Sequence, residues 1–150
     1  MYKPDRGSGQ VVVEMALILP VFLAIVFSIM EIGYISFQVI VLNHATYEVA
    51  RIGGMTSPGT SAGACPSPNS GKLSATMALM LPQATVSCAA VPTLTDPQAM
   101  QLNCDLHCTS VEKIRLVFPI SSLMLSDAGN PGWKTLTASV AMPIERPLQQ

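Results

Sequence analysis

Hydrophobic positions are concentrated near the N-terminus of the chain. Between Met15 and Met30 the only residue that is neither apolar nor proline is Ser28, and extending this window back to Val11 adds a single charged residue, Glu14. At 1.5 Å per residue, the window from Val11 to Met30 spans roughly 30 Å as a helix, which is the thickness of the hydrocarbon core of a bilayer. The pattern therefore predicts a transmembrane helix.

A removable signal peptide is the alternative interpretation of this segment. Its apolar core would be shorter, and a cleavage site between small residues would follow it. Here the apolar character continues as far as Leu42, and no Ala-x-Ala site closes it. A retained helix is therefore favoured.

Beyond Glu31 the pattern changes to apolar residues at three- and four-residue steps, with polar residues between them. This is typical of an amphipathic helix that packs one face on a core. We predict one transmembrane and stem helix over residues 10–52, containing Pro20 and ended by Gly53 and Gly54. The recurring apolar positions are Ile35, Val39, Leu42, Ala45, Val49 and Ile52.

The residues after this helix predict a small distal domain. Residues 53–71 are rich in Gly, Ser, Pro and Thr and are expected to form a linker or loop, and residues 72–150 the domain. Helical spacing predicts a short helix over Lys72–Leu81, and the Asp96-Pro97 pair predicts the start of another that runs to Leu102. A strand is expected over Ala84–Val91.

The clearest strands come last. Residues 113–118 and 135–142 both alternate apolar and polar positions, and the segment between them, residues 126–132, is rich in turn-forming residues. An antiparallel pair packed on the helix stem is expected, with an edge open to a partner strand. The predicted fold class is α+β: a long N-terminal transmembrane helix that continues as a stem, with a small disulfide-containing antiparallel β domain.

Composition and charge exclude several function classes. The chain has 150 residues, 49% of them hydrophobic and 11% charged, with a formal net charge of −1 and no basic run. We therefore expect no nucleic-acid partner. No paired carboxylates, Gly-x-Ser-x-Gly turn, phosphate loop or His-Glu-x-x-His helix occurs. We expect a protein that is not an enzyme and has no cofactor and no small-molecule substrate.

The four cysteines all follow the apolar segment, at Cys65, Cys88, Cys104 and Cys108. An even number on one side of a membrane helix indicates an oxidising compartment and one or two disulfides. Three connectivities are possible, of which Cys65 with Cys88 and Cys104 with Cys108 is one. Cys104-Asp-Leu-His-Cys108 also suggests a metal site that includes His107, but a fourth ligand is lacking nearby, and disulfides with no bound metal are favoured.

The junction before the helix carries the most informative chemistry. Residues 1–9 are polar and include Lys3 and Arg6, which favours a cytoplasmic N-terminus. A carboxylate at Glu14 is costly inside the apolar window unless it has a partner. If a peptidase cuts after Gly9, Gln10 becomes the first residue, and its ammonium group lies about one helical turn from Glu14, in the same chain or a neighbouring one. The alternative is a glutamate that extends to the lipid headgroups with no specific role.

The segment Gly9-Gln10-Val-Val-Val-Glu14 resembles the cleavage region of type IV prepilins. The longer stretch that continues to Pro20 resembles the TadE-like minor pseudopilins of tight-adherence (Flp) systems. Those families also show an acidic residue with glycine further on, here Glu31-Ile-Gly33, and an Ala-Arg pair that closes the helix, here Ala50-Arg51. The resemblance covers about residues 7–53.

The resemblance implies that residues 1–9 are a leader, which a membrane prepilin peptidase removes by cleavage between Gly9 and Gln10. It implies a role for Glu14 in assembly or in the register between subunits. It also implies helix packing at Pro20, Glu31, Gly33 and Arg51. It further implies an accessory subunit of a thin pilus or a related secretion machine. The partners would be other pilin or pseudopilin subunits and platform proteins in the bacterial inner membrane, with the C-terminal domain in the periplasm. The alternative is a signal-anchored binding or adhesion module that keeps its N-terminus.

Overall fold

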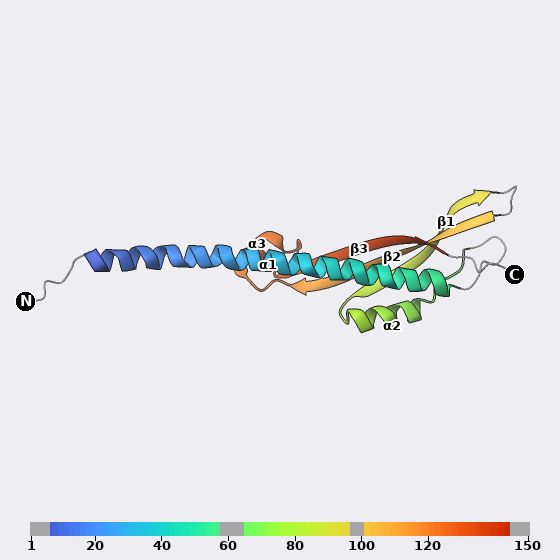
Figure 1. Ribbon diagram of the computed structural model, residues 1–150, viewed down its shortest axis with the longest axis horizontal. Helices are drawn as coiled ribbons and strands as arrows, with labels where there is room; N and C mark the ends of the chain where they lie inside the picture. The colour runs from blue at the N-terminus through green and yellow to red at the C-terminus, as the bar shows by residue number, and fades with distance from the viewer. Residues whose placement is uncertain (1–6, 58–64, 97–100, 145–150) are drawn as a thin grey trace, which may run out of the picture.

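The computed structural model describes residues 7–57, 65–96 and 101–144. Figure 1 shows a long helix whose N-terminal half projects alone, while a sheet and two short helices lie along its second half. This is the predicted α+β class with a long N-terminal helix and an antiparallel sheet. The elements in chain order are α1 (Gly7–Thr56), α2 (Ser70–Met80), β1 (Thr85–Asp96), β2 (Gln101–Arg115), α3 (Pro119–Leu125) and β3 (Trp133–Pro143).

Helix α1 has 50 residues and is therefore about 75 Å long. The predicted helix is confirmed, but the prediction that Gly53 and Gly54 end it is wrong, because α1 continues to Thr56, into the expected linker. Both glycines instead allow close packing. A Cβ on Gly53 would lie 2.5 Å from Leu106 Cδ2, and one on Gly54 would lie 3.2 Å from the carbonyl oxygen of Pro143. A glycine inside a helix destabilises it by only about 1 kcal/mol, whereas a side chain at either position would crowd the sheet. Glycine is therefore favoured at both positions.

The sheet has the order β1-β2-β3, and both pairs are antiparallel. The predicted antiparallel pair of late strands is confirmed as β2 and β3, and the strand expected over Ala84–Val91 is confirmed as part of β1. The helix predicted from Asp96 to Leu102 is wrong at its described residues: Asp96 ends β1, and Gln101 and Leu102 begin β2. Residues 97–100 lie outside the described residues. An Asp-Pro pair occurs at the start of turns as well as of helices. Here the described residues on both sides of the pair form hydrogen-bonded strands, β1 and β2, instead of a helix.

Strand β2 ends at Arg115, three residues earlier than predicted, and α3 follows. Phe118 occupies the N-cap position without a side-chain capping hydrogen bond, and Pro119 lies in the first turn, where a missing N–H costs nothing. Strand β2 also starts far earlier than expected, because β1 supplies its second neighbour.

The turn expected over residues 126–132 is confirmed. Gly129 and Gly132 have φ of 91° and 82°, values that favour glycine. The Asp127 carboxylate accepts the Thr135 N–H at 2.7 Å and pairs with Lys134 at 3.1 Å. The hydrogen bonds from Thr135, together with Lys134, lower the pKa of Asp127. These bonds fix the connection between α3 and β3.

The core lies between one face of the sheet and the second half of α1, and α2 closes it at one side. The helix predicted over Lys72–Leu81 is confirmed as α2, which begins two residues earlier because the Asn69 side chain accepts the Lys72 N–H. Alternate residues of β2 are buried, as expected for a strand with one face on a core. The main buried cluster is Leu42, Ala45, Val49, Leu73, Met77, Ile114, Leu136 and Ala138.

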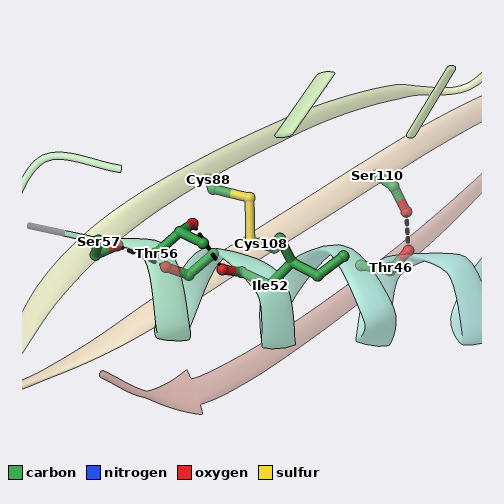
Figure 2. Close-up of a disulfide and its surroundings, with 8 residues drawn as sticks. Thr46, Ile52, Thr56, Ser57, Cys88, Cys108 and Ser110 are labelled. Atoms are coloured by element: carbon green, nitrogen blue, oxygen red, sulfur yellow. Dashed lines mark hydrogen bonds between the residues drawn. A yellow bond between two sulfur atoms is a disulfide. The ribbon is translucent and has the colours of Figure 1, made fainter. Parts of the chain in front are cut away.

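Both disulfides tie strand β2 to other parts of the chain. Cys88 pairs with Cys108, its direct neighbour across β1 and β2, and Cys65 pairs with Cys104. Figure 2 shows the Cys88–Cys108 bridge above α1. The connectivity that joins Cys104 to Cys108 is therefore not the one formed. Four residues along one strand separate their Cα atoms by about 13 Å, which is beyond the reach of a disulfide.

Buried polar side chains lie in and beside the interface between α1 and β2. The hydroxyl groups of Thr46 and Ser110 are hydrogen-bonded to each other (Figure 2), and both residues are fully buried. Glu112, two residues along β2, is buried as well, and its Oε2 has no hydrogen-bond partner among the described residues. Burial raises the pKa of Glu112, because the ionised carboxylate loses hydration.

We expect Glu112→Gln to stabilise the folded domain at pH 7 by roughly 1 kcal/mol, since it removes a buried charge that lacks a full set of partners. The raised pKa means that the folded state holds the proton more tightly than the unfolded state does. The destabilisation by native Glu112 should therefore grow as pH rises above 4.5 and disappear below it. Thermal unfolding of both proteins in detergent at pH 4 and pH 7 checks this. An equal difference at both pH values would contradict it.

Candidate functional site

The structure places Gly9 and Gln10 within the first turns of α1, both exposed. A Cβ added to Gly9 would meet no described atom within 4 Å, and its backbone does not have the positive φ that favours glycine. Neither packing nor backbone geometry among the described residues therefore requires glycine here. The described fold therefore does not explain glycine at this position.

Glu14 lies one turn further along the same helix and is exposed. Gln10 Nε2 donates a hydrogen bond to Glu14 Oε1 at 3.2 Å. The side chains at positions 10 and 14 share a helix face, because residues four apart are neighbours on its surface. The geometry thus brings the two residues of the predicted junction together, with the backbone nitrogen of Gln10 one turn before the carboxylate.

The apolar segment around this junction is fully exposed. Residues 9–23 are all exposed, and the most apolar window of the helix has none of its residues buried by the rest of the chain. A core helix of a soluble protein would be buried by its neighbours. The chain therefore has one apolar N-terminal helix that is long enough to cross a membrane and is compatible with a single-pass anchor.

Glu31 lies in the first part of α1 that contacts the distal domain, one turn after Phe27. It is only 4% exposed, and its Oε1 accepts the backbone N–H groups of Val117 at 2.5 Å and Phe118 at 3.3 Å. A carboxylate that accepts main-chain N–H groups makes stronger hydrogen bonds than a neutral acceptor does. Glu31 thus fastens the segment between β2 and α3 to the helix.

An aromatic pair lies one turn below this contact. The rings of Phe27 and Phe118 are stacked with centroids 5.0 Å apart.

The sequence identified Glu31 only as a helix-packing candidate. Its partner could not be found from sequence, because the acceptor and the two donors are separated by 86 and 87 positions. The one available signal was an acidic residue at the end of an apolar run.

Gly33 begins an exposed stripe along α1. A Cβ on Gly33 would meet no described atom within 4 Å. Phe37, Ile40 and Tyr47 continue the stripe at steps of four, three and seven residues, and all three are exposed. This is the spacing of a helix seam that packs against another helix. Pro20 is also exposed, lower on α1.

Arg51 lies on the exposed surface near the end of α1. Its Nε is 3.6 Å from Glu48 Oε2, the weak pair expected for residues three apart. The structure brings Arg51 near neither Glu14 nor Glu31, because α1 is one continuous helix and these residues are separated by many turns.

The histidines and cysteines form no metal centre in the described part of the chain. Within residues 7–57, 65–96 and 101–144, no group of three or more His, Cys, Asp or Glu side chains lies together. All four cysteines are bound in disulfides, so their sulfurs are not free thiolates. His107 and His44 are both exposed.

Comparison with known proteins finds a family match, and the matched segment contains the predicted cleavage junction, Glu31 and Arg51. Residues 9–51 match the family model of TadE-like protein. The N-terminal helix of this chain is TadE-like. No curated protein and no solved structure matches the chain. The matched segment begins at Gly9 and ends at Arg51, so the TadE-like resemblance is confirmed for this part of α1. The sheet lies beyond the matched residues.

We expect Glu31→Ala to weaken the attachment of the α3 segment to the TadE-like helix. Loss of the charged acceptor for these two part-buried N–H groups costs roughly 1–3 kcal/mol. Amide hydrogen exchange at Val117 and Phe118 should accelerate by at least tenfold in detergent-solubilised protein.

Glu48→Ala is the matched control, because it removes an acidic residue of the same helix whose partner, Arg51, is exposed. Such pairs contribute less than about 1 kcal/mol. Unchanged exchange at Val117 in Glu31→Ala, or equal acceleration in both variants, would show that Glu31 does not hold this segment.

Proposed function

We propose that this protein is a minor pseudopilin, an accessory structural subunit in the assembly of a tight-adherence (Flp-type) pilus or a related secretion machine, processed after Gly9 by a prepilin peptidase. The observation that carries the proposal is the TadE-like match over residues 9–51, which falls on a helix whose N-terminal part contacts no other described part of its own chain. A helix of this kind requires lipid or other subunits around it.

The length of the apolar surface supports packing against other helices. Exposed apolar residues run from Val11 to Ile40, which is about 45 Å of helix and longer than the roughly 30 Å hydrocarbon core. The part that extends beyond the bilayer carries the stripe of Gly33, Phe37, Ile40 and Tyr47. Neighbouring subunits in a helical bundle would cover that stripe, and Gly33 would allow a close approach.

Glu14 supplies a means of setting the stagger between subunits. Cleavage after Gly9 creates a positive ammonium group on Gln10, one helical turn before Glu14. In an apolar bundle, a carboxylate and an ammonium group from adjacent chains stabilise each other strongly, because unpaired charges are costly there. The pairing would favour one axial register over others.

Charge and redox chemistry favour one orientation. The basic residues of the leader favour a cytoplasmic N-terminus, and the two disulfides favour an oxidising compartment for the sheet. We therefore place α1 in the bacterial inner membrane and the distal domain in the periplasm. The partners would be the prepilin peptidase, other pilin subunits and inner-membrane platform proteins, and the role would be structural rather than catalytic.

The alternative is a signal-anchored binding or adhesion module that keeps residues 1–9. The antiparallel sheet has β1 and β3 as its two outer strands, which could receive an added strand from a partner. The intact mass of protein purified from native membranes separates the two functions. A chain that begins at Gln10 supports the pseudopilin, and one that begins at Met1 supports the anchor.

We expect Gly9→Ala to block maturation, so that the intact mass retains the first nine residues. The added methyl group meets no described atom, so the fold itself should tolerate it. Gly33→Ala is the matched control, because its Cβ is equally unobstructed but it lies far from the junction, and it should mature normally. A fully shortened Gly9→Ala product would reject processing at this site.

We expect Glu14→Ala and Glu14→Gln to be cleaved normally and to assemble several-fold fewer pili. Both remove the charge, whereas Gln keeps a polar side chain of the same length. Pilus counts by electron microscopy, with intact mass as the control for cleavage, check the prediction. Wild-type pilus numbers in both variants would reject a pairing role for the Glu14 charge.

A further inference from the structure

The end of the distal domain nearest the N-terminal half of α1 carries an exposed apolar surface. Val117, Leu123 and Met124 are 76%, 86% and 79% exposed. They come from α3 and the segment just before it, which Figure 1 shows beside the middle of α1. Side chains of this kind in water would be unfavourable as a group, so their surroundings require an explanation.

The depth of this surface follows from its contacts with α1. Phe118 stacks on Phe27, and the adjacent N–H groups are held by Glu31. If the apolar window from Val11 to Met30 fills the hydrocarbon core, Phe27 lies about 5 Å inside its outer boundary. The start of α3 is then level with the outer leaflet rather than with bulk water.

The neighbouring strand ends carry the residues that a lipid surface favours. Lys113 and Arg115 are exposed at the end of β2, and Trp133 is paired with Arg115 at the start of β3. Lys113 and Trp133, with Asn130 and Thr135, line a shallow cavity of about 190 Å³. Tryptophan prefers the level of the headgroups, and basic side chains bind anionic phosphates there.

We propose that α3 is a second membrane contact of this protein. Val117, Leu123 and Met124 lie among the acyl chains of the outer leaflet, Trp133 lies at the headgroup level, and Lys113 and Arg115 bind phospholipid phosphates. The occupant is lipid because the surface continues the exposed apolar surface of α1 at the same depth. The inference rests on the membrane insertion of α1 proposed above. It means that the domain is held against the bilayer and that extraction of the helix has to remove α3 from lipid.

The test uses the fact that all four native cysteines are in disulfides, so one added cysteine can be labelled alone. Leu123→Cys probes α3. Leu79→Cys on α2 is the matched control, because Leu79 is 87% exposed and Leu123 is 86% exposed. Ile18→Cys reports on insertion of α1. Each variant carries an environment-sensitive fluorophore and is placed as a single copy in nanodiscs of phosphatidylethanolamine and phosphatidylglycerol.

Iodide in the water should quench the label at position 123 several-fold less than the label at position 79, and about as little as the label at position 18. Nitroxide-labelled lipid should quench positions 123 and 18 but leave position 79 bright. Replacing phosphatidylglycerol with phosphatidylcholine should raise iodide quenching at position 123 by a larger factor than at position 79, which corrects for the repulsion of iodide by the anionic lipid. An equal factor at both positions would overturn the binding of anionic headgroups by Lys113 and Arg115.

The remaining outcomes separate this inference from the proposed function. Protection at position 18 with full iodide access at position 123 would overturn the membrane contact of α3 and leave the inserted helix intact. Iodide access at position 18 would overturn insertion of α1, and the inference with it. Protection at position 123 only when several copies share a nanodisc would assign the surface to a second copy of the chain and overturn lipid as its occupant.

Discussion

The packing of the sheet on the second half of α1 is the contact on which the rest of the structure depends. The apolar face of β2 and β3 has α1 as its main cover, and α2 closes only one side of the core. Gly53 lets the helix approach Leu106, and the buried hydroxyl pair of Thr46 and Ser110 fixes the rotation of the helix against the strand. Without this contact a three-stranded sheet of this size would have little core of its own.

The same packing joins the second half of the helix to the domain at several separated contacts. Glu31 holds the chain at the membrane-proximal end of the sheet, and the Cys65–Cys104 disulfide joins the segment before α2 to β2. A force applied along α1 is therefore transmitted to the domain at several separated points. Under the proposed function, these contacts would let the domain follow when the helix is drawn out of the membrane.

Local periodicity predicted the helices α1 and α2 and the strand character of β3, because each of these elements shows its burial pattern along the chain. The failures have non-local causes. The short helix expected after Asp96 was overridden by strand pairing, α3 was missed because the alternation at 113–118 runs past the real end of β2, and the partner of Glu31 lies 86 positions away. The disulfide connectivity likewise depends on strand register, which sequence spacing does not contain.

The glycines of α1 divide into those that the fold explains and those that it does not. A side chain at Gly53 or Gly54 would collide with or crowd the sheet, whereas one at Gly9 or Gly33 would meet no described atom within 4 Å. Glycine inside a helix is unfavourable by about 1 kcal/mol, so packing on the sheet compensates this cost at Gly53 and Gly54. Gly9 and Gly33 both lie in the TadE-like segment. The proposed function assigns a peptidase site to Gly9 and a helix contact to Gly33, two positions at which the described residues place no packing constraint.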